Sequence, residues 1–525
     1  MTHKQSRLEL LVKSNQQNLL KGGLKGIEKE SLRITADNQI SQQAHPTKLG
    51  SALTHSSITT DYSEALLEFI TPPFAEIDDA LNYMKALHKF TYDQIGDELL
   101  WATSMPCGIS GDKSIPIAQY GSSNIGKMKH IYRQGLGHRY GRAMQVIAGI
   151  HYNYSVPETL WPALKELEGS NKSLDEFQND GYFSMTRNLQ HNGWLLLYLF
   201  GASPALCKSF LKSHHDNQSV ALKEFDDYTL YKPHATSLRM SDIGYKNSHQ
   251  ATLNISYNNV SEYVACLTQA IEMPWPAYEN IGVNVGGEYR QLNDRLLQIE
   301  NEYYSTVRPK QIAQAGEKPT LALKRRGVRY IEIRSLDLNP YDPVGMSAPQ
   351  LRFVEAFALY CLLSESPEDS LSTKNSFKFN ISETARRGRK PDLLLDSSGD
   401  RRKLTEWALE LLDAIQPICE LLDSGEKEPL YQQALAQQIE RTHNAELTPS
   451  AKILAGMQQE KEPFGCYAMR LSQQQKSYFE NFKLNENRKK ELEAEAVKSL
   501  EAQNQLESEE QPLFDQFLAN YFSQQ

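Results

Sequence analysis

Residues 26–34 read Gly26-Ile27-Glu28-Lys29-Glu30-Ser31-Leu32-Arg33-Ile34, with apolar and polar side chains alternating at the period of a β-strand. Side chains two positions apart in an extended chain point to the same side. Glu28 and Glu30 must therefore share one face of the predicted strand.

Three other stretches have the same strand period and carry metal-ligand types on one face: residues 66–70, 150–156 and 330–336. In the last of these, the isoleucines lie on the face away from Glu332 and Arg334, as in a sheet that buries one side. His151 lies on one face of the second stretch. Glu68 is embedded in the otherwise apolar first stretch, where a carboxylate needs a partner.

These stretches can bring hard oxygen ligands and one imidazole onto one sheet face, a set suited to magnesium that carries nucleotide phosphates. Asp61 is expected at a nearby loop or strand end. We therefore predict a metal site made by Glu28, Glu30, Asp61, Glu68, His151 and Glu332. The competing interpretation is a set of surface salt bridges, such as Glu332 with Arg334 on a solvated sheet face.

The composition is that of a large globular protein. The chain has 525 residues, 40% of them hydrophobic, which is enough for a substantial core. A chain of this length is expected to form two or three compact units or one elaborated domain. Lys and Arg total 56 against 65 Asp and Glu, a net charge of −9. This balance gives no support to a polyanionic partner such as nucleic acid.

The sequence predicts neither secretion nor a membrane anchor. The start of the chain lacks an apolar core with a small-residue cleavage site, and the apolar run at 193–201 is too short to cross a bilayer. The six cysteines are scattered without a CxxC pair. We expect them to be incidental thiols in a reducing cytosol, not a disulfide or zinc framework, and we expect a cytoplasmic protein.

The periodicity predicts a mixed first part and a helical second part. Helical spacing is expected at 77–93, 351–363 and 404–422, and residues 160–225 are expected to be mostly helical with a break at 201–204. Gly286-Gly287 predicts a tight hairpin between antiparallel strands. We therefore divide the chain into a catalytic α+β region, 1–349, and a mainly helical scaffold packed on it, 350–525, which is not expected to be an independent domain.

Two polar segments of the second part have open interpretations. Residues 386–391 concentrate positive charge beside a glycine and a proline, which suits a surface loop that reaches phosphates or carboxylates, or a simple solvated loop. Residues 485–511 are rich in Glu, Lys, Ala and Gln, and predict an exposed helix with weak coiled-coil potential.

Phosphates must be held without a P-loop. Residues 22–26 fail the Walker spacing and lack the hydroxyl after lysine. Metal ions and arginines can replace such a loop, and the candidates are Arg239, Arg308 and Arg334. Each of these arginines could equally form a structural ion pair.

The ordered set of motifs closely resembles the glutamate–cysteine ligase family of gamma-proteobacteria. The resemblance is carried by residues 25–33, 50–55, 59–72, 119–121, 149–153, 199–205, 235–239, 298–302 and 330–337. These blocks occur in a fixed order over most of residues 20–350. Beyond residue 391 the likeness thins to a helical-scaffold interpretation.

The resemblance implies an antiparallel sheet curved into a funnel with helices packed outside, distantly related to glutamine synthetase. It implies that the six predicted ligands are the family's magnesium ligands. It also implies a cysteine pocket formed by Tyr132, Leu136, Gln145, Arg239, Tyr245 and Tyr304. Arg334 would meet the glutamate or the phosphoryl group, so that Arg334 and Glu332 would act in catalysis.

The activity implied by the resemblance is ATP- and magnesium-dependent joining of the γ-carboxylate of L-glutamate to the amine of L-cysteine through γ-glutamyl phosphate. This is the first step of glutathione biosynthesis. The family also implies feedback inhibition by glutathione. We further expect two or three magnesium ions with ATP and, because nothing in the sequence demands an oligomer, a monomer. The alternatives are a ligase with a different amine acceptor and a catalytically silent scaffold whose acids form surface pairs.

Overall fold

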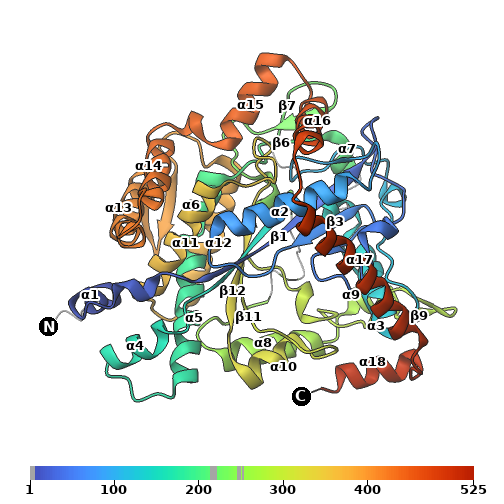
Figure 1. Ribbon diagram of the computed structural model, residues 1–525, viewed down its shortest axis with the longest axis horizontal. Helices are drawn as coiled ribbons and strands as arrows, with labels where there is room; N and C mark the ends of the chain where they lie inside the picture. The colour runs from blue at the N-terminus through green and yellow to red at the C-terminus, as the bar shows by residue number, and fades with distance from the viewer. Residues whose placement is uncertain (1–5, 213–221, 245–249, 251–252, 525) are drawn as a thin grey trace.

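The computed structural model describes residues 6–212, 222–244, 250 and 253–524. Its centre is a seven-stranded antiparallel sheet in the order β11-β12-β5-β1-β3-β2, with β4 paired to β1 (Figure 1). The strands are β1 (Leu24–Ile34), β2 (Ile58–Thr60), β3 (Leu66–Ile70), β4 (Leu99–Leu100), β5 (Ile150–Ser155), β11 (Val307–Lys310) and β12 (Tyr330–Leu336). All four predicted stretches are strands of this one sheet.

The register of the sheet places the predicted ligands side by side. Glu28 of β1 lies opposite His151 of β5, and Glu30 lies opposite Glu68 of β3. On the other side of β5, Glu332 pairs with Asn153. Because neighbouring strands are about 4.8 Å apart, this register brings residues from distant parts of the sequence within reach of one ion.

The opposite face of the sheet is apolar and meets helices. Ile27, Phe69 and Ile333 are fully buried there, and Phe69 packs against His88 of α2 (Ile77–Tyr92). Helices α5 (Leu174–Asn192) and α6 (Trp194–Phe200) pack against β12. The alternation seen in the sequence therefore separates a core face from a polar face, and the predicted α+β class is confirmed.

The first part also contains the following smaller elements. The helices are α1 (Arg7–Lys13), α3 (Asn124–Tyr140), α4 (Leu160–Leu167), α7 (Lys208–Lys212), α8 (Val260–Glu272), α9 (Pro276–Glu279) and α10 (Pro319–Arg326). The small strands are β6 (Ala205–Cys207), β7 (Lys223–Glu224), β8 (Thr229–Tyr231), β9 (Asn284–Val285) and β10 (Glu288–Tyr289).

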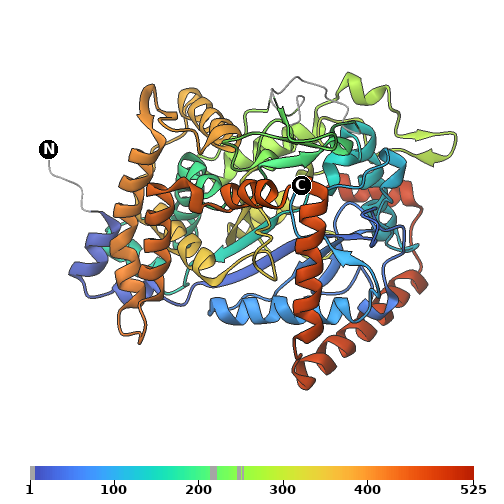
Figure 2. The same cartoon turned by 90° about the horizontal axis from the view of Figure 1, so that it is seen from above.

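The second part is mainly helical, and its helices lie on several sides of the sheet region (Figure 1 and Figure 2). It contains α11 (Ala348–Leu363), α12 (Leu371–Arg387), α13 (Leu404–Asp423), α14 (Leu430–His443), α15 (Pro449–Glu460), α16 (Phe464–Asn481), α17 (Glu486–Ser508) and α18 (Phe514–Phe522), with a hairpin of β13 (Leu394–Ser397) and β14 (Asp400–Lys403). Buried side chains of both parts form one continuous core.

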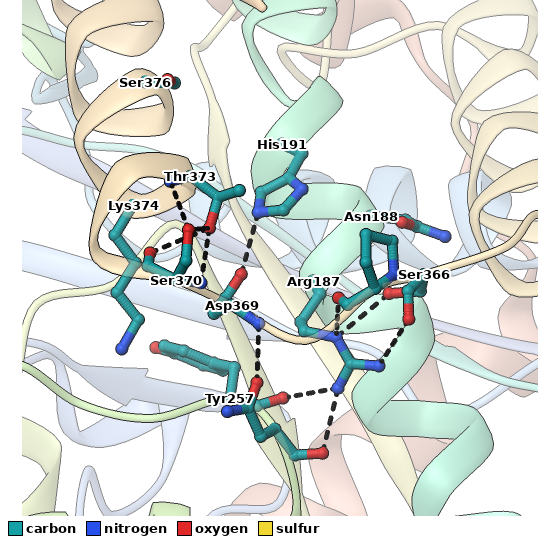
Figure 3. A network of polar contacts seen from close by, with 12 residues as sticks. Arg187, Asn188, His191, Tyr257, Ser366, Asp369, Ser370, Thr373, Lys374 and Ser376 are labelled. Atoms are coloured by element: carbon teal, nitrogen blue, oxygen red, sulfur yellow. Dashed lines mark hydrogen bonds and ion pairs between the residues drawn. The ribbon is translucent and has the colours of Figure 1, made fainter. Parts of the chain in front are cut away.

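Polar contacts also join the two parts. Lys25 of β1 forms a buried ion pair with Glu355 of α11 (2.7 Å), whose other oxygen accepts a hydrogen bond from Tyr431 of α14 (2.7 Å). Figure 3 shows a second junction, where Arg187 of α5 donates to the carbonyl oxygens of Tyr257 (2.9 Å) and of other main-chain segments. These contacts tie the helical part to the strands that carry the site.

The structure differs from three of the predictions of local structure. Residues after 204 form β6 and β8, not a continuing helix, because the extended chain at 205–207 pairs with 229–231. Arg386 and Arg387 lie in the last turn of α12, not in a loop, and Arg386 pairs with the carboxylate of Asp242. Helix α17 is not merely exposed, since Ser499 is buried and its hydroxyl accepts the amide of Ser51 (2.9 Å).

The hairpin at Gly286-Gly287 is confirmed, and both glycines have positive φ, 66° and 92°. It stands apart from the main sheet as β9 and β10. Of the helices in the described part of the chain, none combines the length and the apolar character needed to span a membrane.

The expectation of six free thiols is wrong for one pair. Cys107 and Cys207 form a disulfide with Cα atoms 5.5 Å apart, although they are separated by 100 residues in the sequence. No spacing rule could indicate this pair, because only the folded chain brings the two residues together. The other four cysteines are free: Cys266, Cys361, Cys419 and Cys466.

Candidate active site

A cavity of about 470 Å³ lies over the polar face of the sheet. It is walled by α3 and by the segments around Glu302 and Pro319. Eleven of the predicted site residues line this one cavity: Glu28, Glu30, Asp61, Glu68, Tyr132, Leu136, Gln145, His151, Tyr304, Glu332 and Arg334. Residues from four strands, from the end of β2 and from α3 therefore converge on one space.

The centre of the site is formed by Glu28, His151 and Glu332. One ligand atom of each lies within 4.8 Å of the other two. His151 Nδ1 is 2.9 Å from Glu28 Oε2 and 3.8 Å from Glu332 Oε1. This arrangement, two carboxylates and an imidazole from three adjacent strands, could hold a metal ion.

Three further acids extend this centre along the sheet. Glu30 Oε1 is 3.8 Å from His151 Nε2, and its other oxygen accepts the amide of Gly149 (2.6 Å). Glu68 lies opposite Glu30 in the register. Asp61 directly follows β2, as expected, and its carbonyl oxygen accepts the hydroxyl of Tyr120 (3.1 Å).

The pKa shifts of the acids indicate that nearby positive charge would stabilise their ionised forms. Burial and the charges of neighbouring acids hold the pKa of Glu68 well above its usual value, and burial raises the pKa of Glu30. Burial alone would raise the pKa of Glu28, but the hydrogen bond with His151 and the positive charges of His151 and Lys310 together lower it. Carboxylates crowded in this way repel one another unless cations lie between them.

The residues present fit a divalent cation. Among the described residues, the buried oxygen Oε2 of Glu332 has no hydrogen-bond donor, a costly state for a carboxylate unless another group uses that oxygen. The donor set is mostly carboxylate oxygen with one imidazole, which favours a hard ion over one that prefers thiolates. The alternative interpretation is wrong in placing Glu332 on a solvated sheet face, because Glu332 is only 2% exposed, although its ion pair with Arg334 does form (3.2 Å).

Three cations surround the acids. Arg334 Nη1 is 3.2 Å from Glu332 Oε1, while Lys310 and Arg308 approach the same carboxylate at 3.8 and 3.9 Å. Burial would raise the pKa of Glu332, but Lys310, Arg334 and His151 outweigh it and hold that pKa low. Cations that line a cavity beside a metal centre can bind phosphate oxygens.

Arg239 contacts the main chain of β12 beside this site. Its Nη2 donates to the carbonyl oxygen of Arg334 (2.9 Å), and its Nη1 lies 3.4 Å from Asp337 Oδ1. Gly149 permits this approach, since a Cβ there would lie 2.0 Å from Arg239 Nη2. Arg239 is 1% exposed and is not among the residues that line the cavity, while the predicted Tyr245 lies outside the described residues.

Several residues of the cavity wall were not predicted, among them Lys129, Arg133, Tyr140, Lys310 and Tyr521. Lys310 lies two positions after Arg308 on the same strand, so the strand period could have indicated it. Arg133 follows Tyr132 in α3, but no local signal shows which side of that helix faces the sheet. Tyr521 lies in the last helix, almost two hundred positions beyond the other site residues, where the sequence gives no indication of a site.

An antiparallel sheet that presents a carboxylate–imidazole centre, flanked by arginine and lysine in one cavity, is typical of a metal-dependent enzyme that handles phosphates. Comparison with known proteins gives the particular family. The model of the glutamate–cysteine ligase family matches residues 8–384.

Curated relatives agree with this match. A glutamate–cysteine ligase of Alcanivorax borkumensis is 49% identical over 528 residues, covering 99% of this chain and 100% of the relative. One of Pseudomonas fluorescens is 44% identical over 515 residues, covering 98% and 96%. The chain belongs to the glutamate–cysteine ligase family, as the resemblance predicted, and is an ATP-dependent enzyme of that family.

Solved structures show the same fold. The crystal structure of a glutamate–cysteine ligase of Francisella tularensis, in complex with AMP, has a TM-score of 0.89 at 38% identity and covers 96% of this chain and 98% of its own. A bifunctional glutathione synthetase of Pasteurella multocida shares the fold with a TM-score of 0.72 at 24% identity, over 90% of this chain and 55% of that one.

Proposed function

We propose that this chain joins the γ-carboxylate of L-glutamate to the amine of L-cysteine at the cavity over the sheet, with ATP and two or three magnesium ions. The observation that carries the proposal is the convergence of Glu28, His151 and Glu332, from three separate strands, in a cavity that also contains Arg334. The family membership names the reaction, and this geometry supports the assignment of the reaction to these residues.

The first step activates glutamate. An oxygen of the γ-carboxylate attacks the γ-phosphorus of ATP, the bond from that phosphorus to the bridging oxygen breaks, and ADP leaves with the bonding pair. Arg334 and Lys310 lie where they can neutralise charge on the transferring phosphoryl group. Magnesium held by Glu28, Glu30, Asp61, Glu68, His151 and Glu332 would supply further positive charge to the phosphates.

The second step forms the amide. The cysteine amine attacks the carbonyl carbon of γ-glutamyl phosphate, the carbon–oxygen bond to phosphate breaks, and the amine loses a proton. Tyr132, Leu136, Gln145 and Tyr304 line the cavity and form the proposed cysteine pocket, which Arg239 supports through the carbonyl of Arg334. The enzyme needs no nucleophile of its own, because positioning two reactants against each other supplies much of the acceleration.

Coupled ADP release tests this function. Wild-type protein with ATP, magnesium and glutamate should release ADP slowly, and cysteine should accelerate release and yield γ-glutamylcysteine in equal amount. A panel of other amines serves as the control for the acceptor. Fast turnover with a different amine and none with cysteine would replace cysteine as the substrate, and no ADP release under any condition would favour a silent scaffold.

The proposal also covers the oligomeric state, the cellular location and the inhibition of the protein. We infer a monomer that works in the cytoplasm and is inhibited by glutathione, which shares the γ-glutamyl and cysteinyl groups of the substrates. Sedimentation of the purified protein at micromolar concentration tests the monomer. Competition between glutathione and glutamate in initial-rate measurements tests the inhibition.

A further inference from the structure

Strand β12 has an irregularity opposite His151. Its pairing with β5 is regular up to Ile333 and resumes at Leu336. On β5, only His151 lies between the partners of these two residues, so Arg334 and Ser335 together face one residue. This two-to-one arrangement is a β-bulge, which bends a strand and redirects its side chains. The bulge therefore lies at the residue that carries the arginine of the cavity.

The bulge decides which face the end of β12 presents. Strict alternation from Glu332 would place Leu336 on the polar face, beside Arg334. Leu336 instead pairs with Ile150, a residue of the core face, and is 1% exposed. Because directly paired residues point to the same face, Leu336 also belongs to the core face. The strand thus turns its alternation around directly after Arg334, and the position of Arg334 depends on the geometry of this turn.

The main chain of Arg334 is held by groups outside β5. Its amide donates to the carbonyl oxygen of Thr306 (2.9 Å), and its carbonyl oxygen accepts Arg239 Nη2 (2.9 Å). Arg239 is 1% exposed, so this charge-assisted hydrogen bond is shielded from water. The guanidinium of Arg239 therefore fixes the bulge at its first residue.

Asp337 in turn holds the guanidinium of Arg239. Its Oδ1 lies 3.4 Å from Arg239 Nη1 and accepts the hydroxyl of Ser237 (3.0 Å), while its Oδ2 accepts the amide of Ala202 (2.8 Å). The side chain of Asp337 is fully buried. A buried ion pair adds little net stability compared with apolar side chains of the same volume. Its place beside the bulge is therefore explained better by geometry than by stability.

We propose that Asp337 is a positioning residue of the ligase reaction. It orients Arg239, Arg239 holds the bulge, and the bulge places the guanidinium of Arg334 in the cavity, with Nη1 3.2 Å from Glu332 Oε1. Asp337 does not line the cavity, so it acts through these neighbours alone. The inference deepens the proposed function and rests on it, because that proposal assigns Arg334 to the transferring phosphoryl group.

Steady-state kinetics of Asp337→Asn test the proposal. The amide keeps the shape of the side chain but removes the charge that orients Arg239. A displaced Arg334 should lower kcat for γ-glutamylcysteine formation about tenfold to a hundredfold. Binding of magnesium–ADP, measured by calorimetry, should stay within about twofold, because the residues of the proposed metal centre keep their places. A variant with the kcat of the wild type overturns the proposal, and so does an equal loss of kcat and of ADP binding.

The matched control is Asp423→Asn, the same change at another buried aspartate. Asp423 accepts the main-chain amides of Tyr431 (3.0 Å) and Gln432 (2.9 Å) in the helical part and does not line the cavity. It should keep kcat within about twofold, whatever stability it loses. A loss of kcat as large as that of Asp337→Asn would attribute both losses to general destabilisation and overturn the proposal.

Gly149→Ala displaces Arg239 while it leaves Asp337 intact, and it serves if Asp337→Asn folds poorly. A Cβ at residue 149 would lie 2.0 Å from Arg239 Nη2. The main-chain amide that donates to Glu30 (2.6 Å) is retained in this variant. We expect kcat to fall as in Asp337→Asn, with ADP binding again within about twofold. Wild-type kcat in Gly149→Ala would contradict a role of Arg239 in holding the bulge.

Crystal structures of the wild type and of Asp337→Asn, both without substrates, separate this inference from the proposed function. We expect the guanidinium of Arg334 to move by about 1 Å or more away from Glu332 in the variant. An unmoved Arg334 overturns the inference. A displaced Arg334 in the variant, together with a wild type that ligates no amine, would leave the positioning role of Asp337 standing and remove the proposed reaction instead.

Discussion

Glu332 is the residue on which the proposed metal centre depends most. It pairs with Arg334, approaches Lys310 and His151, and keeps one buried oxygen without a hydrogen-bond donor among the described residues. Its isosteric replacement removes the charge while it keeps the shape. A comparison of the Glu332→Gln variant with the wild type therefore separates the effect of the charge from the effect of packing.

Glu332→Gln should lower kcat by about two orders of magnitude or more, because a metal ligand and its charge are lost together. The far-UV circular dichroism should stay unchanged, and the rise in Tm caused by magnesium–ADP should disappear. The matched control, Glu493→Gln at an exposed position of α17, should keep both activity and the Tm shift. Full activity of Glu332→Gln at saturating magnesium would contradict the role of this residue.

His45 makes the stability depend on pH. Burial, with a smaller effect of Arg33 and His55, lowers the pKa of His45 to about 4 from a usual value of 6.5. Between these values the unfolded chain binds a proton that the folded chain does not, so the free energy of unfolding must fall as the pH drops from 6.5 towards 4.

His45→Gln removes this titration. Urea unfolding at several pH values in that window should show a shallower loss of stability for the variant, with a difference of more than about 1 kcal/mol across the window. Parallel curves for the two proteins would mean that His45 titrates alike in the folded and unfolded chains.

At the scale of elements, α5 and the segment between α11 and α12 are joined by Arg187. Its guanidinium donates to the carbonyl oxygens of Tyr257, Asn258 and Ser366 at 2.9, 3.0 and 3.2 Å, and nearby His191 pairs with Asp369 at 2.9 Å (Figure 3). Three separate segments therefore share one polar network.

Arg187→Met should lower the free energy of unfolding by about 3 kcal/mol, since several buried carbonyls lose a charged donor at once. Chemical denaturation measures this change. Lys172→Met is the matched control, because the Lys172 pair with Asp180 is exposed and its loss should cost about 0.5 kcal/mol or less. Equal effects of the two substitutions would show that the network contributes little.

The sequence predicted the elements whose signal is local. Glu28, Glu30, His151 and Glu332 follow from the strand period, because alternation fixes the face of each side chain before any partner is known. The helices at 77–92 and 404–423 follow from their apolar spacing. The convergence of these strands, however, was an expectation that only the pairing of β1 with β5 and of β5 with β12 could decide.

Features that depend on long-range packing could not be predicted. The Cys107–Cys207 disulfide, the pairing of Arg386 with Asp242, and the place of Tyr521 in the cavity all join residues that lie far apart in the sequence. No local pattern records which surfaces meet. The assignments of individual residues to magnesium, glutamate or cysteine likewise stay predictions, because the comparisons establish the family and not the roles of residues.

For the whole molecule, we propose that residues 1–349 and 350–525 form one cooperative unit. Both contribute to one continuous core, and the buried Lys25–Glu355 pair crosses between them. Thermal unfolding followed by calorimetry and by circular dichroism should give one transition with coincident midpoints. Two separated transitions would show that the helical part is an independent domain.

The central claim is that this cavity transfers the γ-phosphoryl group of ATP to glutamate before the amide forms. The most direct measurement uses glutamate whose γ-carboxylate carries heavy oxygen, with ATP, magnesium and cysteine, and mass spectrometry of the products. We predict one labelled oxygen in the released inorganic phosphate for each γ-glutamylcysteine formed, together with unlabelled ADP. Label found in AMP, or phosphate without label, would contradict the account.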